Sequence, residues 1–188
     1  MDLLVIISGI AVAISVVVFL TPKFVRYTEE ITIDASVAQI YDHIRFQKDL
    51  MRWSAWPSET GSTCECQQED GGVGAQTVFF DKEGKRIGHQ EVTAISENKS
   101  VDFELFGGGP PHKAKMQFEL IPINATRTKV LLHFTNEIMP PFNLVLRLVG
   151  VVSWTRKLHQ KDLDGLKRFS EPPFQIYTGQ PASISGTT

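Results

Sequence analysis

The sequence predicts an α+β domain in which a curved antiparallel sheet is wrapped on one long C-terminal helix, preceded by one N-terminal transmembrane helix. Three observations indicate this fold class: an uncharged apolar run at the start, a middle region of alternating apolar and polar residues, and an apolar stripe at helical spacing near the end. The expected organisation is a transmembrane helix over residues 1–22, one domain over residues 23–171 and a disordered tail over residues 172–188.

The apolar run from Leu3 to Leu20 contains no charged residue. As a helix it spans roughly 27 Å, which is enough for the hydrocarbon core of a bilayer. A cleaved signal peptide is one alternative, but it would have a basic start and a small-residue cleavage site, whereas this chain starts Met1-Asp2 and leaves the run through Thr21-Pro22-Lys23. A helix of the domain core is the other alternative, but such a helix normally shows a polar side to water.

The residues that flank this run predict its orientation. Lys23 and Arg26 follow the run, and Asp2 precedes it. Basic residues are retained on the cytoplasmic side of a membrane helix. We therefore expect a single-pass membrane protein whose domain lies in the cytoplasm.

Composition limits the classes of partner. The chain of 188 residues has 19 Lys and Arg against 21 Asp and Glu, so it lacks the basic excess of a nucleic-acid-binding protein. Its 12 Phe residues fit either a solid apolar core or an apolar pocket. Cys64 and Cys66 share one face of a predicted strand, are poorly placed for a relaxed disulfide and are expected to be free thiols.

The domain is expected to open with one strand and two short helices. Residues 23–34 end in Ile31-Thr32-Ile33, which predicts the first strand. Asp34-Ala35-Ser36 then offers a helix cap, and apolar residues at helical spacing predict a helix to about Phe46. A second short helix is expected near residues 47–53, and Pro57 stops its continuation.

Six further strands are expected in the middle of the chain. Turn residues separate short runs in which apolar and polar residues alternate. Because the connections are short, the strands should form an antiparallel meander, and its apolar face needs a cover. The expected strands are residues 63–68, 74–81, 85–96, 100–106, 112–122 and 128–137.

A long helix from Pro140 to Glu171 is expected to supply this cover. Its apolar stripe consists of Leu148, Val152, Leu158, Leu163, Leu166 and Phe169, and its polar face of Arg156, Lys157, Lys161, Asp162, Lys167 and Arg168. The stretch over residues 140–152 is unusually apolar. We interpret it as the buried first half of the helix, with a lid over a pocket mouth and a contact with the bilayer as alternatives.

Six motifs along the domain carry a family resemblance. They are Ile31-Thr32-Ile33-Asp34-Ala35 with Val37 and Ile40-Tyr41-Asp42, Trp53-Ser54-Ala55-Trp56, Gly72-Val73-Gly74-Ala75, Gly88 with Glu91-Val92, Thr126-x-Thr128-Lys129-Val130, and Gly165-Leu166-Lys167-Arg168-Phe169-x-Glu171. In this order they resemble the START and polyketide-cyclase superfamily (SRPBCC) of the helix-grip fold, which includes the birch-pollen-allergen-like proteins. Ala55 stands where the family has proline, and the last motif is shortened around its lysine.

The resemblance implies a deep cavity between the curved sheet and the long helix. The superfamily uses this cavity for lipids, sterols, polyketides and other apolar ligands, and members of the most similar branch often carry an N-terminal membrane helix. No single reaction follows from the resemblance, because the fold hosts both carriers and enzymes.

Inward-facing residues of the predicted sheet and helix are the candidate ligand-binding residues. By strand parity and helix position they are Phe79, Phe103, Met116, Phe118, Phe134 and Trp154. The alternative is that the same side chains fill a solid core. Trp53 and Trp56 are expected to anchor the second short helix to the sheet rim, with gating of a ligand as the alternative.

His89 and Glu91 form the candidate pair for acid–base catalysis. They lie two positions apart on one predicted strand and so point to the same face, although parity does not say whether that face is cavity or solvent. No metal-ligand spacing and no phosphate-binding loop stands out, so neither a metal nor a cofactor is expected.

The favoured function is therefore membrane-anchored binding of a hydrophobic small molecule or lipid, with no nucleic-acid partner. A cyclase or dehydratase-type enzyme acting on an apolar substrate and a filled-core domain that binds a protein partner are the alternatives. Inward-facing ionisable residues would favour the enzyme, a purely apolar cavity the carrier, and the absence of a cavity the partner-binding domain.

Overall fold

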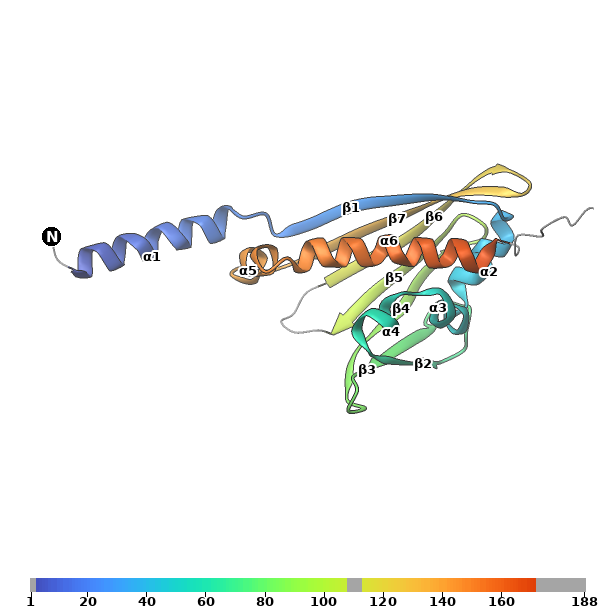
Figure 1. Cartoon of the computed structure of the whole chain (residues 1–188), viewed down its shortest axis with the longest axis horizontal. Coiled ribbons are helices and arrows are strands. Elements are labelled where there is room, and N and C mark those ends of the chain that lie inside the picture. Colours follow the sequence, from blue (N-terminus) through green and yellow to red (C-terminus); the bar gives the residue numbers. More distant parts are fainter. Residues whose placement is uncertain (1–2, 108–112, 172–188) are drawn as a thin grey trace, which may run out of the picture.

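The computed structural model describes residues 3–107 and 113–171. Within these residues a seven-stranded antiparallel sheet carries helix α6 along one face, and helices α2 to α4 cover one part of the sheet (Figure 1). The predicted α+β class with an N-terminal apolar helix and a long C-terminal helix is confirmed. The tail predicted over residues 172–188 lies outside the described residues.

The elements follow in the predicted order, with one short helix added and the last helix divided into two. The strands are β1 Phe24–Ile33, β2 Thr63–Gln67, β3 Gln76–Phe80, β4 Arg86–Ser96, β5 Ser100–Gly107, β6 Lys113–Asn124 and β7 Arg127–Glu137. The helices are α1 Leu3–Leu20, α2 Val37–Arg45, α3 Gln47–Trp53, α4 Trp56–Thr60, α5 Phe142–Leu148 and α6 Val151–Ser170. Across the sheet the order is β1-β7-β6-β5-β4-β3-β2, so the meander closes back with β7 beside β1.

The unexpected helix is α4. Pro57 lies in its first turn, and Gly61, with a φ of +69°, ends it. A proline is tolerated in the first turn because the amide groups there have no partner within the helix. The predicted end of α3 at Trp53 is confirmed, but a proline that stops one helix can also start the next, so the sequence pattern does not reveal α4.

The last part of the domain forms two helices, α5 and α6, rather than one. Gly150 lies between them with a φ of +79°, which residues with a Cβ atom rarely adopt and which an α-helix does not contain. The prediction of one continuous helix from Pro140 is therefore wrong. The prediction that the first half of this helix is buried is also wrong, because Leu148 and Val149 are 77% and 66% exposed.

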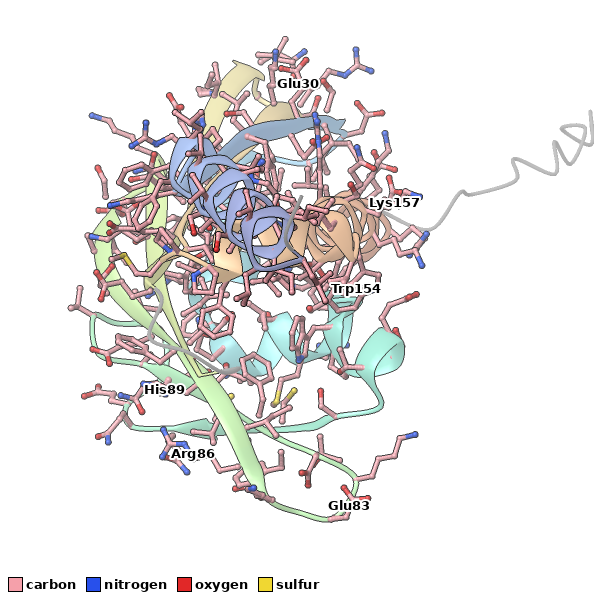
Figure 2. The ribbon with its side chains drawn as sticks, turned by 90° about the vertical axis from the view of Figure 1, so that its left-hand side faces the viewer. Glu30, Glu83, Arg86, His89, Trp154 and Lys157 are labelled. Atoms are coloured by element: carbon pink, nitrogen blue, oxygen red, sulfur yellow. The ribbon has the colours of Figure 1, made fainter. Side chains whose placement is uncertain are left out.

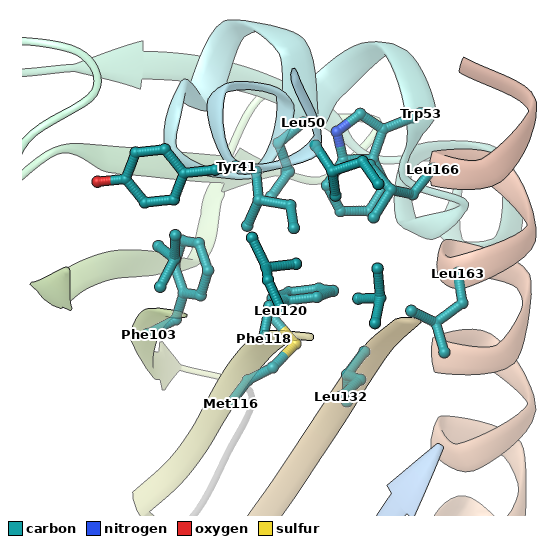
Figure 3. Close-up of a cluster of buried hydrophobic side chains, with 14 of the residues drawn as sticks. Tyr41, Leu50, Trp53, Phe103, Met116, Phe118, Leu120, Leu132, Leu163 and Leu166 are labelled. Carbon is teal, nitrogen blue, oxygen red and sulfur yellow. The ribbon is translucent and has the colours of Figure 1, made fainter. Parts of the chain in front are cut away.

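The apolar core occupies the part of the domain where α2 and α3 meet the sheet (Figure 3). Trp53 and Phe103 each meet Phe118 edge-on, with ring centroids 6.0 Å apart. Other large members of the cluster are Leu50, Met116, Leu120, Leu132, Leu163 and Leu166. Burial of each such side chain contributes about 1.5–3 kcal/mol, so this cluster fixes α3 and the second half of α6 to the sheet.

A buried amide adds a polar tie between α3 and the sheet. The Oε1 atom of Gln47 accepts hydrogen bonds from Thr77 Oγ1 at 3.0 Å and from Gln90 Nε2 at 2.9 Å. All three residues are buried. Because an unpaired buried polar group costs about 1–3 kcal/mol, this network holds the start of α3 against β3 and β4.

Helix α1 is not part of the domain core. It has 18 residues, and none of them is buried. By length and composition it is able to cross a membrane. The alternative that this run is a core helix is therefore wrong.

Helices α6 and α3 are in close contact at Gly165. A Cβ atom at this position would lie 2.0 Å from the backbone oxygen of Trp53. Protein interiors are close-packed, so no larger residue fits unless one helix moves. Glycine at this position therefore sets the distance between α3 and α6.

Replacing Gly165 with alanine should destabilise the protein. Overpacking costs about 1–3 kcal/mol, which exceeds the roughly 1 kcal/mol that alanine gains over glycine inside a helix. Asp164→Ala, at the exposed neighbouring position, is the matched control and should change stability by less than about 0.5 kcal/mol. Urea unfolding of the full-length protein in detergent micelles measures both, and a Gly165→Ala variant as stable as its control would contradict the close contact.

Candidate ligand cavity

A cavity of about 590 Å³ lies between the sheet, the α3–α4 segment and the first half of α6. This volume falls within the range of roughly 300–1,000 Å³ that is usual for small-molecule sites. Aromatic and aliphatic side chains form most of its wall. Residues of α5 and of the segment before it, among them Met139, Phe142 and Leu146, line the end that lies away from the packed core.

Most of the predicted ligand-binding residues lie in this wall. The lining residues include Phe79, Met116, Phe118, Phe134 and Trp154. Phe103 does not line the cavity and is 1% exposed within the core. Its strand parity is inward, as predicted, but α2 packs over this part of β5, so the side chain is covered. For these residues the structure separates pocket from core along the strands, which parity alone does not do.

The two tryptophans of the Trp53-Ser54-Ala55-Trp56 motif occupy different environments. Trp53 is buried, and its Nε1 donates a hydrogen bond to the backbone oxygen of His43 at 3.0 Å, so it anchors α3. Trp56 lines the cavity, with its ring centroid 5.7 Å from that of Phe79 and 6.0 Å from that of Trp154. The three rings of Trp56, Phe79 and Trp154 form an aromatic wall that joins α4, β3 and α6.

A buried carboxyl group also lines the cavity. Asp162 on α6 is 8% exposed, and its Oδ1 accepts hydrogen bonds from the backbone N of Ala55 at 2.7 Å and from Ser54 Oγ at 2.9 Å. Burial raises the pKa of Asp162 to about 6, against the opposing effect of these two hydrogen bonds. Among the described residues no hydrogen bond uses its Oδ2 atom.

One helical turn earlier, His159 contributes a second ionisable group. It is 5% exposed, lines the cavity and shares a hydrogen bond of 2.9 Å between its Nδ1 and the hydroxyl of Tyr27. Burial lowers the pKa of His159 to about 4, so its imidazole is neutral at pH 7. Burial and the nearby Glu29 raise the pKa of Tyr27, which keeps its proton.

Asp162 is predicted on the polar face of the helix, which is wrong, because both Asp162 and the equally polar His159 are buried. At about 100° per residue, positions 159 and 162 fall inside the arc that the buried residues Leu158, Leu163 and Leu166 define. The true polar face carries Lys161, which pairs with Glu59 at 2.5 Å. A helical projection restricted to residues 151–170 identifies the two buried groups. A projection that starts at Pro140 adds the apolar residues of α5, which do not continue the buried face of α6.

The proposed catalytic pair His89 and Glu91 does not come together in the cavity. Both project from the face of β4 opposite to that of Gln90 and Val92, which are buried. His89 is among the residues that line the cavity, but its ring stacks on that of Phe106, with centroids 4.5 Å apart. Glu91 does not line the cavity and accepts a hydrogen bond from Gln76 Nε2 at 2.9 Å.

Two buried polar atoms of cavity-lining residues have no hydrogen-bond partner among the described residues. They are the Nε1 donor of Trp56 and the Oδ1 acceptor of Asn136. Buried polar atoms are normally paired with protein, water or ligand. Within residues 3–107 and 113–171, no group of three or more His, Cys, Asp or Glu side chains could hold a metal ion.

Comparison with known proteins places this geometry in a family. Residues 25–171 match the family described as polyketide cyclase / dehydrase and lipid transport. The match covers nearly the whole domain and well over half of the chain. No curated protein matches the chain.

Solved structures share the fold at low sequence identity. Norcoclaurine synthase from Thalictrum flavum, in complex with dopamine and hydroxybenzaldehyde, has a TM-score of 0.58 at 13% identity, covering 81% of this chain and 90% of that chain. A protein from Chromobacterium violaceum has a TM-score of 0.53 at 17% identity, covering 81% and 99%. One from Nitrosospira multiformis has a TM-score of 0.56 at 18% identity, covering 78% and 96%.

These identities show a shared fold and nothing beyond it. They agree with the resemblance to the START and polyketide-cyclase superfamily that the six sequence motifs carry. The family match over residues 25–171 adds the narrower assignment. The chain belongs to the polyketide cyclase / dehydrase and lipid transport family.

Proposed function

We propose that this protein binds one hydrophobic small molecule or lipid in the cavity, while α1 anchors the domain to a membrane. The observation that carries the proposal is a cavity of about 590 Å³ with a largely aromatic and aliphatic wall. The lipid transport in the family's description fits such a wall. The proposed ligand contacts are Phe79, Met116, Phe118, Phe134 and Trp154, and Phe103 supports them from the core.

Burial of apolar surface would supply the binding energy. Each square ångström of apolar ligand surface removed from water contributes about 25 cal/mol. The cavity volume suits a ligand of drug-like size, such as a fused ring system or a single alkyl chain. An anchored domain also meets membrane-dissolved molecules at a raised effective concentration.

The unpaired polar atoms of the wall narrow the ligand class further. Trp56 Nε1 offers a donor and Asn136 Oδ1 an acceptor. A hydroxyl group on the ligand can serve either atom, and each unmet buried group costs about 1–3 kcal/mol. We therefore expect an apolar body that carries at least one hydrogen-bonding oxygen.

A cyclase or dehydratase-type enzyme is the second candidate function. The observation that favours it is the pair of ionisable groups in the cavity wall, Asp162 and His159. A carboxyl group with a pKa of about 6 can exchange protons near neutral pH. However, Asp162 also ties α6 to Ser54 and Ala55, and this structural role is sufficient to explain its burial. A filled-core partner-binding domain is least supported, because the cavity is open.

Filling the cavity should abolish ligand retention. Ala114 on β6 is 4% exposed and lines the cavity, so the ring in Ala114→Phe would occupy ligand space. Native mass spectrometry of the full-length protein extracted from membranes should detect a bound apolar mass in the unmodified chain and a loss of that mass in the variant. The mass also identifies the ligand class.

Lys115→Phe is the matched control, because it places the same ring on the exposed side of the same strand. It should keep the bound mass, and lipid adhering to α1 should be equal in both variants. Equal ligand occupancy in Ala114→Phe and Lys115→Phe would contradict binding in the cavity. A protein that carries no apolar mass and takes up no apolar probe would favour the partner-binding alternative.

Asp162→Asn should remove a pH dependence of stability. The pKa of Asp162 is about 6 in the folded protein against an ordinary value of 3.8, so between these values the folded state holds a proton that the unfolded state has released. The contribution of Asp162 to stability therefore falls as pH rises from about 4 to 6, by on the order of 3 kcal/mol, and levels off above, whereas the buried His159 contributes a slope of opposite sign that both proteins share. Asparagine does not titrate, so the variant should lack this contribution.

Urea unfolding of both proteins at pH 4 to 7 measures this difference, and parallel stability curves would contradict the buried carboxyl. The same variant separates the two candidate functions. A binding protein should retain its ligand in Asp162→Asn. If the protein is an enzyme that relies on this group, the unmodified protein should convert the bound molecule into a product, and the variant should bind the same molecule without converting it.

The orientation of the anchor has its own test. Lys23 and Arg26 follow α1, so the proposed location of the domain is the cytoplasm. A reporter that is active only outside the cytoplasm should be silent when fused after Thr188 and active when fused before Met1. Activity of the fusion after Thr188 would mean the opposite orientation or a cleaved signal peptide.

A further inference from the structure

Helix α5 is bonded to the last turn of α1. Asn143 is fully buried, and its Nδ2 donates hydrogen bonds to the backbone oxygens of Thr21 at 2.8 Å and Val18 at 3.3 Å. The last carbonyl groups of a helix have no partner within the helix, so Asn143 caps α1 from another element. These bonds place α5 beside the point where α1 ends.

Arg147, one turn after Asn143, strengthens the same junction. Its guanidinium donates a hydrogen bond to the backbone oxygen of Phe24 at 3.1 Å. A positive charge near the C-terminal end of α1 also interacts favourably with the helix dipole. In addition, only residues 21–23 separate α1 from β1, so the domain is joined to α1 by a short connection and by side-chain hydrogen bonds.

The side of α5 that faces away from this junction is apolar and exposed. Phe142, Val145, Leu148 and Val149 are 41%, 46%, 77% and 66% exposed. Positions three and four apart share one helix face, so the four side chains form one surface, which we call the α5 surface. Leu146, on an adjacent side of the helix, lines the cavity.

The mouth of the cavity lies next to this surface. Six large apolar residues line the cavity and are also at least 36% exposed, namely Ile87, Phe106, Met139, Phe142, Val151 and Trp154. Figure 2 views the molecule from the α1 end, and Trp154 lies on that end near α4. The rim of the mouth is therefore apolar and belongs to the end of the domain from which α1 departs.

We infer that the α5 surface inserts into the leaflet in which α1 ends, so that the cavity opens to the hydrocarbon of that leaflet. The occupant is a lipid bilayer, because α5 is bonded to the last turn of a helix that the proposed function places in a bilayer. Lys23 and Arg26 flank the same junction and suit anionic headgroups. This inference rests on the proposed function and deepens it: the ligand is a molecule dissolved in the membrane, and it enters without crossing water.

A depth measurement tests the placement of α5. The full-length protein, with Cys64 and Cys66 replaced by serine, is labelled with bimane at Leu148→Cys and reconstituted in phosphatidylcholine vesicles with brominated acyl chains. The label should lose most of its fluorescence relative to vesicles without bromine. The control is Ile123→Cys on β6, which is 53% exposed and lies in the β6–β7 hairpin, at the end of β1 away from α1; its label should keep its fluorescence.

Equal fluorescence of the label at position 148 in both kinds of vesicle would overturn the inference. A protein partner or a second copy of the chain on the α5 surface would give this same result, because it would keep brominated lipid away. Quenching at both positions would overturn it as well, since the domain would then lie flat on the membrane.

A rate measurement tests entry from the leaflet. Leu148→Asp should slow the transfer of a pyrene-labelled alkyl alcohol from vesicles into the cavity without changing the final occupancy, and Ile123→Asp should change neither. An unchanged rate would overturn leaflet entry. If native mass spectrometry detects no bound apolar mass in the protein with an unmodified cavity, while the label at position 148 is still quenched, the proposed function is overturned and the placement of α5 stands.

Discussion

The close contact between α6 and α3 at Gly165 determines how the rest of the domain is arranged. It holds the second half of α6 against α3, where Leu163 and Leu166 enter the core. In the first half of the same helix, Trp154 lines the cavity. Since the sheet continues beneath both halves, a helix fixed at one end covers a packed core at that end and an open space at the other.

Asp162 lies where the packed core gives way to the cavity. Its carboxyl group accepts hydrogen bonds from Ser54 and Ala55, which hold the turn before α4 against α6. The same turn positions Trp56, the first residue of α4, at the cavity wall. A single buried group therefore fixes the wall of the site and also places a titratable proton in it, so the structural and chemical roles of Asp162 are linked by geometry.

Much of the domain can be predicted from the sequence because period-two alternation and turn residues define the strands directly. The strands expected from residue 63 to residue 137 all occur, with ends within about two residues in most cases. Parity also places Phe103 and Phe118 on the inner face. It does not predict which of the two lines a cavity, because that depends on how far α2 and α3 extend over each strand.

The helices depend more strongly on tertiary structure. The break at Gly150 requires a left-handed backbone conformation, which the sequence permits but does not require. Once the break is known, the buried arc of α6 and the exposed α5 follow from helical periodicity. The burial of the polar residues Asp162 and His159 can thus be predicted only after the start of α6 has been located.

The short connection between α1 and β1 limits how the domain can be oriented relative to α1. A domain on a long linker samples many orientations, whereas the three-residue connection over residues 21–23 and the hydrogen bonds of Asn143 restrict the orientation of this domain relative to α1. On the proposed placement the cavity would equilibrate with one leaflet only. Its occupancy would then report the composition of that leaflet and be insensitive to the composition of the other.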